Sequence, residues 1–358
     1  MSLAATLSRW AHQVWQTRNP LSVFLYPLSL VTRYIVQRKR ARFTTSSNLV
    51  YRSPCPVIVV GNIVVGGTGK TPVVVAVTRH LQSKGWTPGL ISRGYGVHIS
   101  DHVPRLARGH ADAQQIGDEP ALLTQATGAP ICVHPQRALA AQALLEQYPD
   151  VNVIIADDGM QHLALARDIE IAVQDHRGVG NGWLLPAGPL RDQASALSKV
   201  DWLITHINPN DQQPDTPHPQ QADRNLRMYL RPYQVHSLHG EQQFDWGQWQ
   251  TFCQGKSISA VAAIGQPQRF FTMLRQAGLT LTQTRALADH AAIDHSSFVG
   301  LHSDYILITR KDAVKYKAGR DPRIYVVEAQ AMFSHPNWLD DLAHSTQQHH
   351  NALTQRAP

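Results

Sequence analysis

Short apolar runs rich in β-branched residues recur along the chain, and helical stretches of ten or more residues separate several of them. Runs of this kind are typical of strands that are buried on both faces of a sheet. Strands that alternate with helices indicate βαβ units, so the pattern predicts an α/β fold with a mostly parallel sheet flanked by helices. In the first part of the chain the expected strands are 57–60, 89–92, 131–133, 151–156, 169–173 and 202–205, and the expected helices are 71–84, 118–127 and 136–148.

A polar stretch, NPNDQQPDTPHPQQAD at 208–223, interrupts this pattern and predicts a loop or linker. A second α/β segment follows it, and the sequence after about residue 345 is polar, which predicts a frayed tail. The expected elements of the second segment are strands at 228–236, 258–264, 305–309 and 324–328 and a helix at about 267–277. We therefore predict five parts: an N-terminal interfacial segment 1–42, a core 43–207, a linker 208–227, a smaller α/β domain 228–345 and a polar tail 346–358.

The N-terminal segment has an apolar stripe that is too short to span a bilayer. Residues 21–36 read LSVFLYPLSLVTRYIV, whereas a spanning helix needs roughly 20 apolar residues. At helical spacing, one face carries only apolar side chains, and the other carries Ser22, Ser29 and Arg33. The apolar positions are Leu21, Phe24, Leu25, Leu28, Val31 and Ile35.

Basic residues follow this stripe directly, at Arg38, Lys39, Arg40 and Arg42. An apolar helix followed by a basic cluster favours an anchor on an anionic membrane surface, at about 1 kcal/mol per basic residue near the surface. An ordinary amphipathic helix packed on the core is the alternative that the pattern leaves open. A nucleic-acid arm is less favoured, because no recognition module occurs in the rest of the chain.

Composition and charge narrow the class of protein. With 358 residues the chain favours about two domains at roughly 150 residues each, and 43% apolar with 16% charged residues excludes wholesale disorder and a coiled coil. Its three cysteines form no CxxC pair, which indicates a reduced, cytosol-facing protein. No acidic residue precedes Asp101, while twelve of the 33 basic residues do, and this asymmetry predicts an anionic partner.

The sharpest motif follows the first expected strand. Residues 61–72 read GNIVVGGTGKTP between a predicted strand and a predicted helix, which is the context of a phosphate-binding loop. Glycines let backbone N–H groups curl around phosphate oxygens, Lys70 can reach the transferring phosphate, and Thr71 can bind Mg²⁺. The loop departs from the usual G-x-x-x-x-G-K-[ST] pattern, since Val64 takes the place of the first glycine. We predict ATP and Mg²⁺ as cofactors, with the nucleotide held by Gly66, Gly67, Thr68, Gly69, Lys70 and Thr71.

A second motif places two carboxylates at the end of another strand. In VNVIIADDGMQH, residues 151–162, apolar positions lead into Asp157 and Asp158. This arrangement suits a Walker-B carboxylate that holds Mg²⁺ directly or through water. Adjacent carboxylates are costly unless a cation or hydrogen bonds compensate, and the sequence does not say which of the two binds the metal.

These motifs occur in a characteristic order with several others: SRGYG (92–96), GDEP (117–120), GNGWLLPAGPLRD (180–192) and TRKDAVK (309–315). Together they resemble the tetraacyldisaccharide 4′-kinase family, the lipid A 4′-kinases of Gram-negative bacteria. The resemblance implies a P-loop kinase core at 43–207 and phosphorylation of the 4′-hydroxyl of a lipid disaccharide 1-phosphate. It also implies a peripheral position at the cytoplasmic face of the inner membrane, no nucleic-acid partner, and leaves protein partners open.

Three positions depart from the family pattern. The family usually has Glu after PLR, where this chain has Asp192, so the metal role that the resemblance implies there shifts by about one methylene. The Asp-His-His pattern of the second domain keeps Asp289 and His290 but continues with Ala291. Arg310 stands at the Glu position of the family's TEKDAVK pattern.

For the proton of the acceptor hydroxyl, the resemblance points to Asp118 of GDEP acting with His290. A carboxylate that accepts this proton is typically worth about 10²–10⁴ in rate. The alternative for Asp118 is a helix N-cap, because GDEP opens a predicted helix. Arg93, Arg137, Gln161 and Arg191 lie in matching motifs and are expected to bind phosphates or sugar hydroxyls, or else to form structural ion pairs.

Other positions favour plainer roles. His162 is expected to be a hydrogen-bonded structural histidine, and Lys311 and Asp312 are expected to be solvated charges at the start of a helix. Two competing functions use the same P-loop: a kinase with a non-lipid acceptor, and a non-catalytic or regulatory ATPase. Lipid dependence of binding and of phosphoryl transfer separates these possibilities.

Overall fold

The computed structural model describes residues 14–94, 97, 103–109, 111–208, 224–238, 240–289, 291, 293–316 and 321–355. The chain divides into two compact units, and each has its own core. The P-loop unit lies mainly within Thr6–His206 and Phe333–Pro358, and the smaller unit lies mainly within Met228–Met332.

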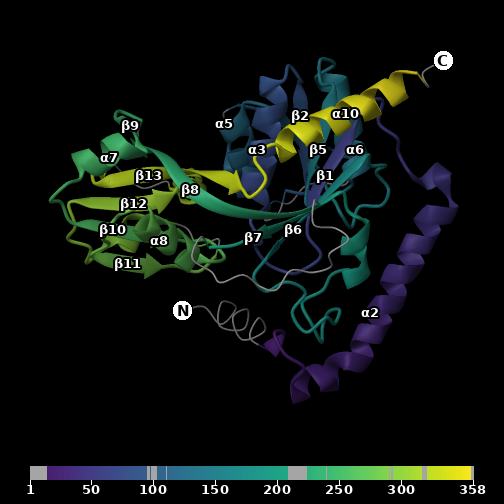
Figure 1. The fold of residues 1–358 in the computed structure, drawn as a ribbon, viewed down its shortest axis with the longest axis horizontal. Helices are drawn as coiled ribbons and strands as arrows, with labels where there is room; N and C mark the ends of the chain where they lie inside the picture. The colour runs from purple at the N-terminus through teal and green to yellow at the C-terminus, as the bar shows by residue number, and fades with distance from the viewer. Residues whose placement is uncertain are drawn as a thin grey trace. The chain divides into compact units, whose positions relative to one another are not determined.

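The P-loop unit is built on a parallel sheet in the order β7-β6-β1-β5-β2-β4, to which β3 adds an antiparallel edge (Figure 1). Every residue of β1, β2, β4 and β5 is buried, as expected for parallel strands that helices cover on both faces. The strands are β1 (Val57–Gly61), β2 (Pro88–Ser92), β3 (Arg105–Arg108), β4 (Pro130–Val133), β5 (Val153–Asp157), β6 (Ile169–Asp175) and β7 (Trp202–His206).

Helices connect these strands and pack on the sheet. Helix α3 follows the P-loop and contacts β1, β2 and β5. Its buried face is formed by Val73, Val74, Val77, Thr78 and Leu81, at the spacing of one helical face. The connecting elements are η1 (Ser47–Leu49), α3 (Lys70–Ser83), α4 (Ala113–Ile116), α5 (Asp118–Thr127), α6 (Arg137–Gln147) and η2 (Ala194–Lys199).

The smaller unit has a sheet in the order β11-β10-β12-β13-β8, with β9 paired to β8. Strand β10 pairs in parallel with β11 and β12, and β12 pairs in parallel with β13. A cluster of aromatic side chains around Trp249 fills one core, where Trp249 lies 4.7 Å from Tyr325 between ring centroids. The elements are β8 (Asn225–Ser237), β9 (Gln243–Asp245), α7 (Trp246–Phe252), β10 (Ile258–Ala262), α8 (Pro267–Gln276), β11 (Gln283–Ala286), η4 (His295–Phe298), β12 (Tyr305–Thr309), α9 (Arg310–Lys315) and β13 (Ile324–Phe333).

The predicted strands and helices all appear at or within a few residues of their expected bounds. The C-terminal end differs from the prediction of a frayed polar tail. Residues Trp338–Thr354 form helix α10, which lies beside α3 in the P-loop unit (Figure 1). The buried side chain of Trp338, which packs against Trp202, and an ion pair of 2.7 Å between Asp340 and Lys84 hold the helix there. The predicted linker 208–223 lies almost entirely outside the described residues.

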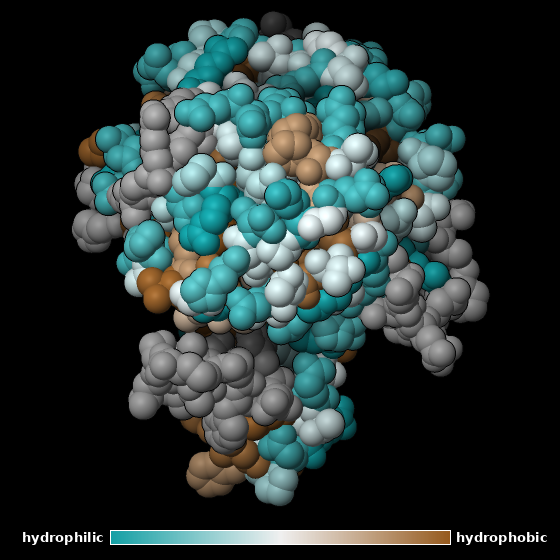
Figure 2. Space-filling model, turned by 90° about the vertical axis from the view of Figure 1, so that its left-hand side faces the viewer, coloured by the Kyte–Doolittle hydropathy of each residue, from teal (hydrophilic) through white to brown (hydrophobic). Residues whose placement is uncertain are grey.

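The N-terminal helix α2 (Pro20–Thr45) joins the apolar stripe and the basic cluster in one element. Asn19 caps it by accepting a hydrogen bond of 3.0 Å from the Ser22 backbone N–H, and Pro20 occupies the first turn. The serine face is turned to the protein and the apolar stripe is not, since Ser22 and Ser29 are buried while Phe24 is 79% exposed. Hydrophobic atoms gather where α2 begins, at the bottom of Figure 2. Leu21 and Leu25 are half-buried, but the rest of the stripe is exposed, so among the described residues the stripe as a whole does not pack on the core.

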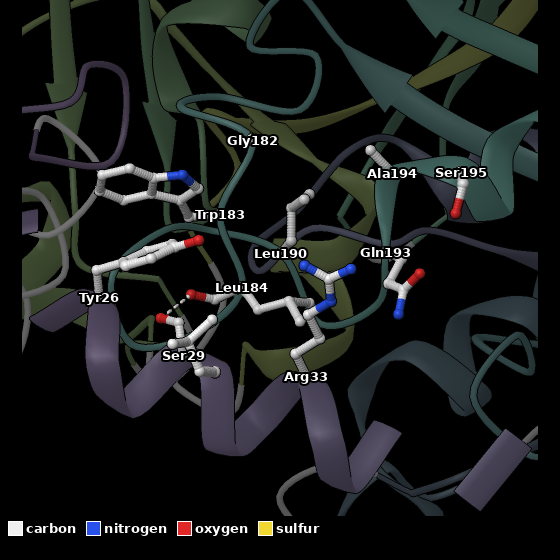
Figure 3. Close-up of a pocket in the computed structure, with 11 residues that line it drawn as sticks. Tyr26, Ser29, Arg33, Gly182, Trp183, Leu184, Leu190, Gln193, Ala194 and Ser195 are labelled. Carbon is white, nitrogen blue, oxygen red and sulfur yellow. Dashed lines mark hydrogen bonds between the residues drawn. The ribbon is translucent and has the colours of Figure 1, made fainter. Parts of the chain in front are cut away.

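Within its unit, α2 contacts the segment that contains the LPAGPLRD motif (Figure 3). The Ser29 hydroxyl donates a hydrogen bond of 2.7 Å to the Leu184 carbonyl and accepts one of 3.1 Å from the Ala187 N–H. The Tyr26 and Trp183 rings lie 4.5 Å apart between centroids. A cavity of about 220 Å³ opens beside these contacts, lined by residues that include Arg33, Leu190 and Gln193. Among the described residues, no helix has the length and apolar character needed to cross a bilayer.

Candidate active site

The P-loop turns between β1 and α3 as the glycine pattern predicts. Gly66 and Gly69 have φ of 100° and 97°, a left-handed region that strongly favours glycine. Gly69 has a second reason to lack a side chain, since a Cβ there would come within 2.5 Å of the His206 imidazole. Gly66 and Gly67 are exposed, Thr68 is fully buried, and a Cβ on Gly67 would meet nothing within 4 Å. The loop therefore presents open backbone at the N-terminus of α3, which fits a phosphate group.

Positive charge converges on Asp158 beside this loop. The Lys70 ammonium lies 3.4 Å from Asp158 Oδ1, and the Arg191 guanidinium donates to both carboxylate oxygens at 3.0 and 2.9 Å. Burial alone would raise the pKa of Asp158, but Lys70 and Arg191 outweigh it and hold the pKa well below its usual range. Asp158 is the non-glycine residue with positive φ, at 52°, among the described residues. The chain thus keeps an ionised carboxylate at the mouth of the loop.

The adjacent Asp157 has the opposite environment. It ends β5, is 5% exposed, and accepts a hydrogen bond of 3.2 Å from the Ser92 hydroxyl. Burial raises the pKa of Asp157, and the negative charge of Glu119 raises it further. The pKa values of two neighbouring carboxylates are therefore shifted in opposite directions, and a divalent cation at this edge would favour the ionised form of both.

Arg137 and Gln161, for which phosphate or sugar binding stays a prediction, both bond the protein itself. The Arg137 guanidinium is 2% exposed and donates to the carbonyls of His134 and Asp157 at 2.9 and 3.3 Å. Burial lowers the pKa of Arg137 to about 10, which leaves it charged at neutral pH. The Gln161 amide donates to the Asn62 carbonyl at 2.9 Å. The Arg137 and Gln161 side chains therefore stabilise the loops that surround the P-loop.

Asp192 has a partner that the sequence did not indicate. Its carboxylate is 3% exposed, and both oxygens accept hydrogen bonds from Arg40 of α2. The Gln193 backbone N–H adds a third bond of 2.8 Å. The structure thus gives this carboxylate an arginine as its counter-charge, and the metal role that the family pattern implied stays a prediction.

The remaining predicted residues lie around the same loop or outside the described part. Arg93 follows β2 and is exposed, and its charge acts on Arg137. Thr71 is the second residue of α3. Asp118 is the first residue of α5 and Gly117 is its N-cap, so the N-cap alternative for Asp118 is wrong. His290 lies outside the described residues.

Sequence reasoning missed three residues that shape the site. The Asn62 amide donates to the Thr68 hydroxyl at 3.3 Å, and Arg177 donates to the Gly67 carbonyl at 3.2 Å. Glu119 acts on the pKa of Asp157 from the first turn of α5. The signal for Asn62 and Glu119 was their place within predicted motifs, whereas Arg177 comes from a loop after β6 that carries no motif. His162 is half-buried, and burial, aided by Arg137 and Lys39, lowers its pKa to about 3.

In the smaller unit, two charged residues of the TRKDAVK motif are structural. Asp312 is fully buried, which corrects the expectation of a solvated charge, and it accepts hydrogen bonds from the Thr309 hydroxyl and the Ala263 N–H at 2.7 and 3.2 Å. Arg310, at the position of the family's Glu, donates to both oxygens of Glu328 at 2.7 Å. Within the described chain, no three His, Cys, Asp or Glu side chains gather as a metal cluster.

Comparisons with known proteins show the family to which the chain belongs. The family described as tetraacyldisaccharide-1-P 4′-kinase matches residues 21–347. A tetraacyldisaccharide 4′-kinase of Bordetella petrii is 47% identical over 341 residues, which cover 95% of this chain and 96% of the relative. One of Idiomarina loihiensis is 40% identical, with 86% of this chain and 88% of the relative covered.

A solved structure supports the fold. The crystal structure of LpxK from Aquifex aeolicus in complex with ATP superposes with a TM-score of 0.74 and covers 91% of this chain and 99% of its own. At 21% identity this likeness concerns the fold alone. The family match extends over nearly the whole chain and includes the P-loop, the paired aspartates and the LPAGPLRD segment. The chain therefore belongs to the tetraacyldisaccharide-1-P 4′-kinase family.

Proposed function

We propose that the protein transfers the γ-phosphoryl group of ATP to the 4′-hydroxyl of a tetraacyldisaccharide 1-phosphate, in lipid A biosynthesis. The observation that carries this proposal is the convergence of Lys70 and Arg191 on Asp158 beside an open glycine loop, in a chain 47% identical to a kinase of that name. Phosphoryl transfer depends on positioning and on neutralising charge, and this cluster offers both.

The residues present fit a nucleotide and a divalent cation. ATP would supply the transferred group and Mg²⁺ would neutralise its developing charge. The exposed backbone of Gly66 and Gly67 would hold phosphate oxygens, and Lys70 would bear on the transferred group. Thr71, Asp157 and Asp158 are the proposed cation ligands, and the family resemblance adds Asp192 to them. Arg191 holds the Asp158 carboxylate, and Arg137 holds the backbone carbonyl of Asp157.

Asp118 is the proposed acceptor of the hydroxyl proton, with His290 as the partner that the family resemblance implies. Its place at the first residue of α5 supports this proposal, because the N-cap role that would otherwise account for it belongs to Gly117. The neighbouring Glu119 already acts on Asp157, so the first turn of α5 lies within electrostatic reach of the phosphate site.

Label transfer tests the function directly. The protein is incubated with γ-labelled ATP, Mg²⁺ and a detergent-dispersed tetraacyldisaccharide 1-phosphate, with free monosaccharides as parallel acceptors. We expect label in the lipid, at its 4′ position, and none in the monosaccharides. Equal labelling of a monosaccharide would replace the proposal with a kinase of broad acceptor choice, and ATP hydrolysis without transfer would replace it with an ATPase.

We further propose that α2 holds the protein on the anionic cytoplasmic surface of the inner membrane. Support comes from the exposed apolar stripe, where Phe24 and Ile35 are 79% and 58% exposed, and from the basic cluster that follows it. Flotation with anionic vesicles tests this. Replacing Phe24 and Ile35 by Ser should reduce flotation by about tenfold or more, whereas Val299→Ser, a matched change at a residue of the smaller unit that is 64% exposed, should not. Equal flotation of both variants would contradict the proposal.

A further inference from the structure

The basic cluster of α2 contains residues with different surroundings. The Lys39 ammonium donates a hydrogen bond of 2.9 Å to the Gln161 carbonyl, and the Arg40 guanidinium pairs with Asp192, with Nε 3.1 Å from Oδ1. The side chains of Arg38 and Arg42 are exposed and make no hydrogen bond or ion pair to the described part of the chain. Two of the four charges are therefore committed to the protein.

Both committed charges reach loops of the phosphate site. Gln161, which Lys39 contacts, bonds Asn62 just before the P-loop. Asp192, which Arg40 contacts, directly follows Arg191, whose guanidinium bonds Asp158 and whose backbone N–H donates to the Ile63 carbonyl at 2.7 Å. Both series of contacts from α2 therefore end at Asn62 and Ile63, the two residues that connect β1 to the P-loop.

The pair between Arg40 and Asp192 is the stronger of the two contacts. Asp192 is 3% exposed, and this guanidinium is its charged partner, which donates from both Nε and Nη2. Without Arg40 a buried carboxylate would lose its counter-charge, and the segment would move toward water to hydrate it. Arg191 would move with it, and a displacement of about 1 Å near the reacting groups can cost about 10²-fold in rate.

We propose that Arg40 is a positioning residue for phosphoryl transfer: from α2 it fixes the segment that carries Arg191, and Lys39 supports the loop of Gln161 in the same way. The inference rests on the proposed kinase function. It divides the basic cluster by role, with Arg38 and Arg42 available to an anionic surface and Arg40 assigned to the active site. Arg40 itself touches neither Asp158 nor Lys70.

The test compares Arg40→Gln with Arg38→Gln, the same substitution two residues away on the same helix. On the detergent-dispersed acceptor, where vesicle binding plays no part, Arg40→Gln should lower kcat by about tenfold or more, because Arg191 is misplaced. Its KM for ATP should stay within about threefold, because the P-loop backbone and Lys70 are intact. Arg38→Gln should keep kcat within about twofold, as expected for an exposed side chain. Arg40→Lys should fall between, since an ammonium keeps the charge and loses the two-donor fork.

Hydrogen–deuterium exchange gives a readout that does not need the acceptor. The amides of residues 189–193 should exchange faster in Arg40→Gln than in the parent and in Arg38→Gln. The reversed pair, Arg40→Asp with Asp192→Arg, should recover part of the kcat that each single change loses. A kcat for Arg40→Gln equal to that of Arg38→Gln, at equal folded fraction, would overturn the inference. So would a lowered Tm with unchanged kcat and exchange, which would make the pair merely structural.

Failure of the kinase proposal gives a different pattern. If the parent transfers no label to the lipid, the proposed function fails by itself. The hydrogen–deuterium exchange comparison then tests the positioning role alone. Faster exchange of the amides of 189–193 that is limited to Arg40→Gln supports the proposal that Arg40 fixes this segment, and equal exchange in Arg40→Gln and Arg38→Gln rejects it.

Discussion

In each unit, two neighbouring parallel strands end beside a turn that contains glycine and beside an aspartate. The two units differ in the groups that surround this aspartate. In the P-loop unit β1 pairs with β5, and the Asp158 side chain is 31% exposed and flanked by Lys70 and Arg191. In the smaller unit β10 pairs with β12, and Asp312 is fully buried. The same arrangement of strands thus leads to two different sites.

The partners of each aspartate account for the difference. Asp312 is bonded by a hydroxyl and a backbone N–H, and burial raises its pKa. For Asp158 the charges of Lys70 and Arg191 outweigh burial and lower the pKa. Asp312 accepts from neutral donors, and the charge of Lys315 does not outweigh its burial, so this carboxylate fixes the start of a helix. The cations around the partly exposed Asp158 instead create a positively charged surface that can bind a phosphate.

The largest expected effect is on turnover, and it distinguishes Lys70 of the P-loop unit from Lys315 of the smaller unit. Lys70→Ala should lower turnover by roughly 10³-fold, because it removes the cation beside Asp158 that we propose to act on the transferred phosphate. Lys315, whose ammonium donates to the Ala263 carbonyl at 3.2 Å in the smaller unit, is the matched control. Lys315→Ala should change kcat by less than about threefold. Steady-state kinetics of both variants check this, and parental turnover in Lys70→Ala would remove the P-loop from the mechanism.

The next effect separates catalysis from stability at the two aspartates. Asp158→Ala should cost about 10²-fold in kcat, since Lys70 and Arg191 lose their common partner. Asp312→Ala should lower the free energy of unfolding by about 1–3 kcal/mol, because the Ala263 N–H and the Thr309 hydroxyl lose their acceptor. Kinetics and denaturant unfolding of both variants make the comparison. If Asp312→Ala lost activity at full folded fraction, the smaller unit would have a direct part in the chemistry.

The smallest effect concerns the pH dependence of stability. The pKa of His162 in the P-loop unit is lowered to about 3, so its neutral form stabilises the fold above pH 6.5 and this stabilisation is lost as the pH falls below it. The pKa of His236 in the smaller unit is raised, chiefly by its hydrogen bond to Glu328, so its stabilisation is present at low pH and lost as the pH rises through that pKa.

Substitution by Gln tests the two histidines in opposite directions. Between pH 6.5 and 4, His162→Gln should reduce the acid loss of stability by a slope of up to about 1.4 kcal/mol per pH unit. His236→Gln should instead lose more stability at pH 5 than at pH 8. Denaturant unfolding across this range measures both, and parallel pH profiles for the two variants would contradict the assigned environments.

Much of the P-loop edge could be predicted from sequence because local rules govern it. Apolar runs define β1 and β5, and the glycine spacing defines the turn and the place of Lys70. The role of Asp312 could not be predicted, since a charged residue at the start of a helix is usually solvated. Its burial depends on the Ala263 N–H, 49 residues earlier in the chain, which no local pattern reveals.

The N-terminal helix shows where this limit lies. Its periodicity determined a helix with one apolar face and one face of serines, followed by a basic cluster. Only the tertiary structure decided that the serine face meets the protein, because the carbonyl of Leu184 and the N–H of Ala187 have to find polar partners. The sequence likewise determined that four of the five residues at 38–42 are basic. The fold decided that Arg40 reaches Asp192, 152 residues away, because a buried carboxylate requires a counter-charge and helix geometry brings that one guanidinium to it.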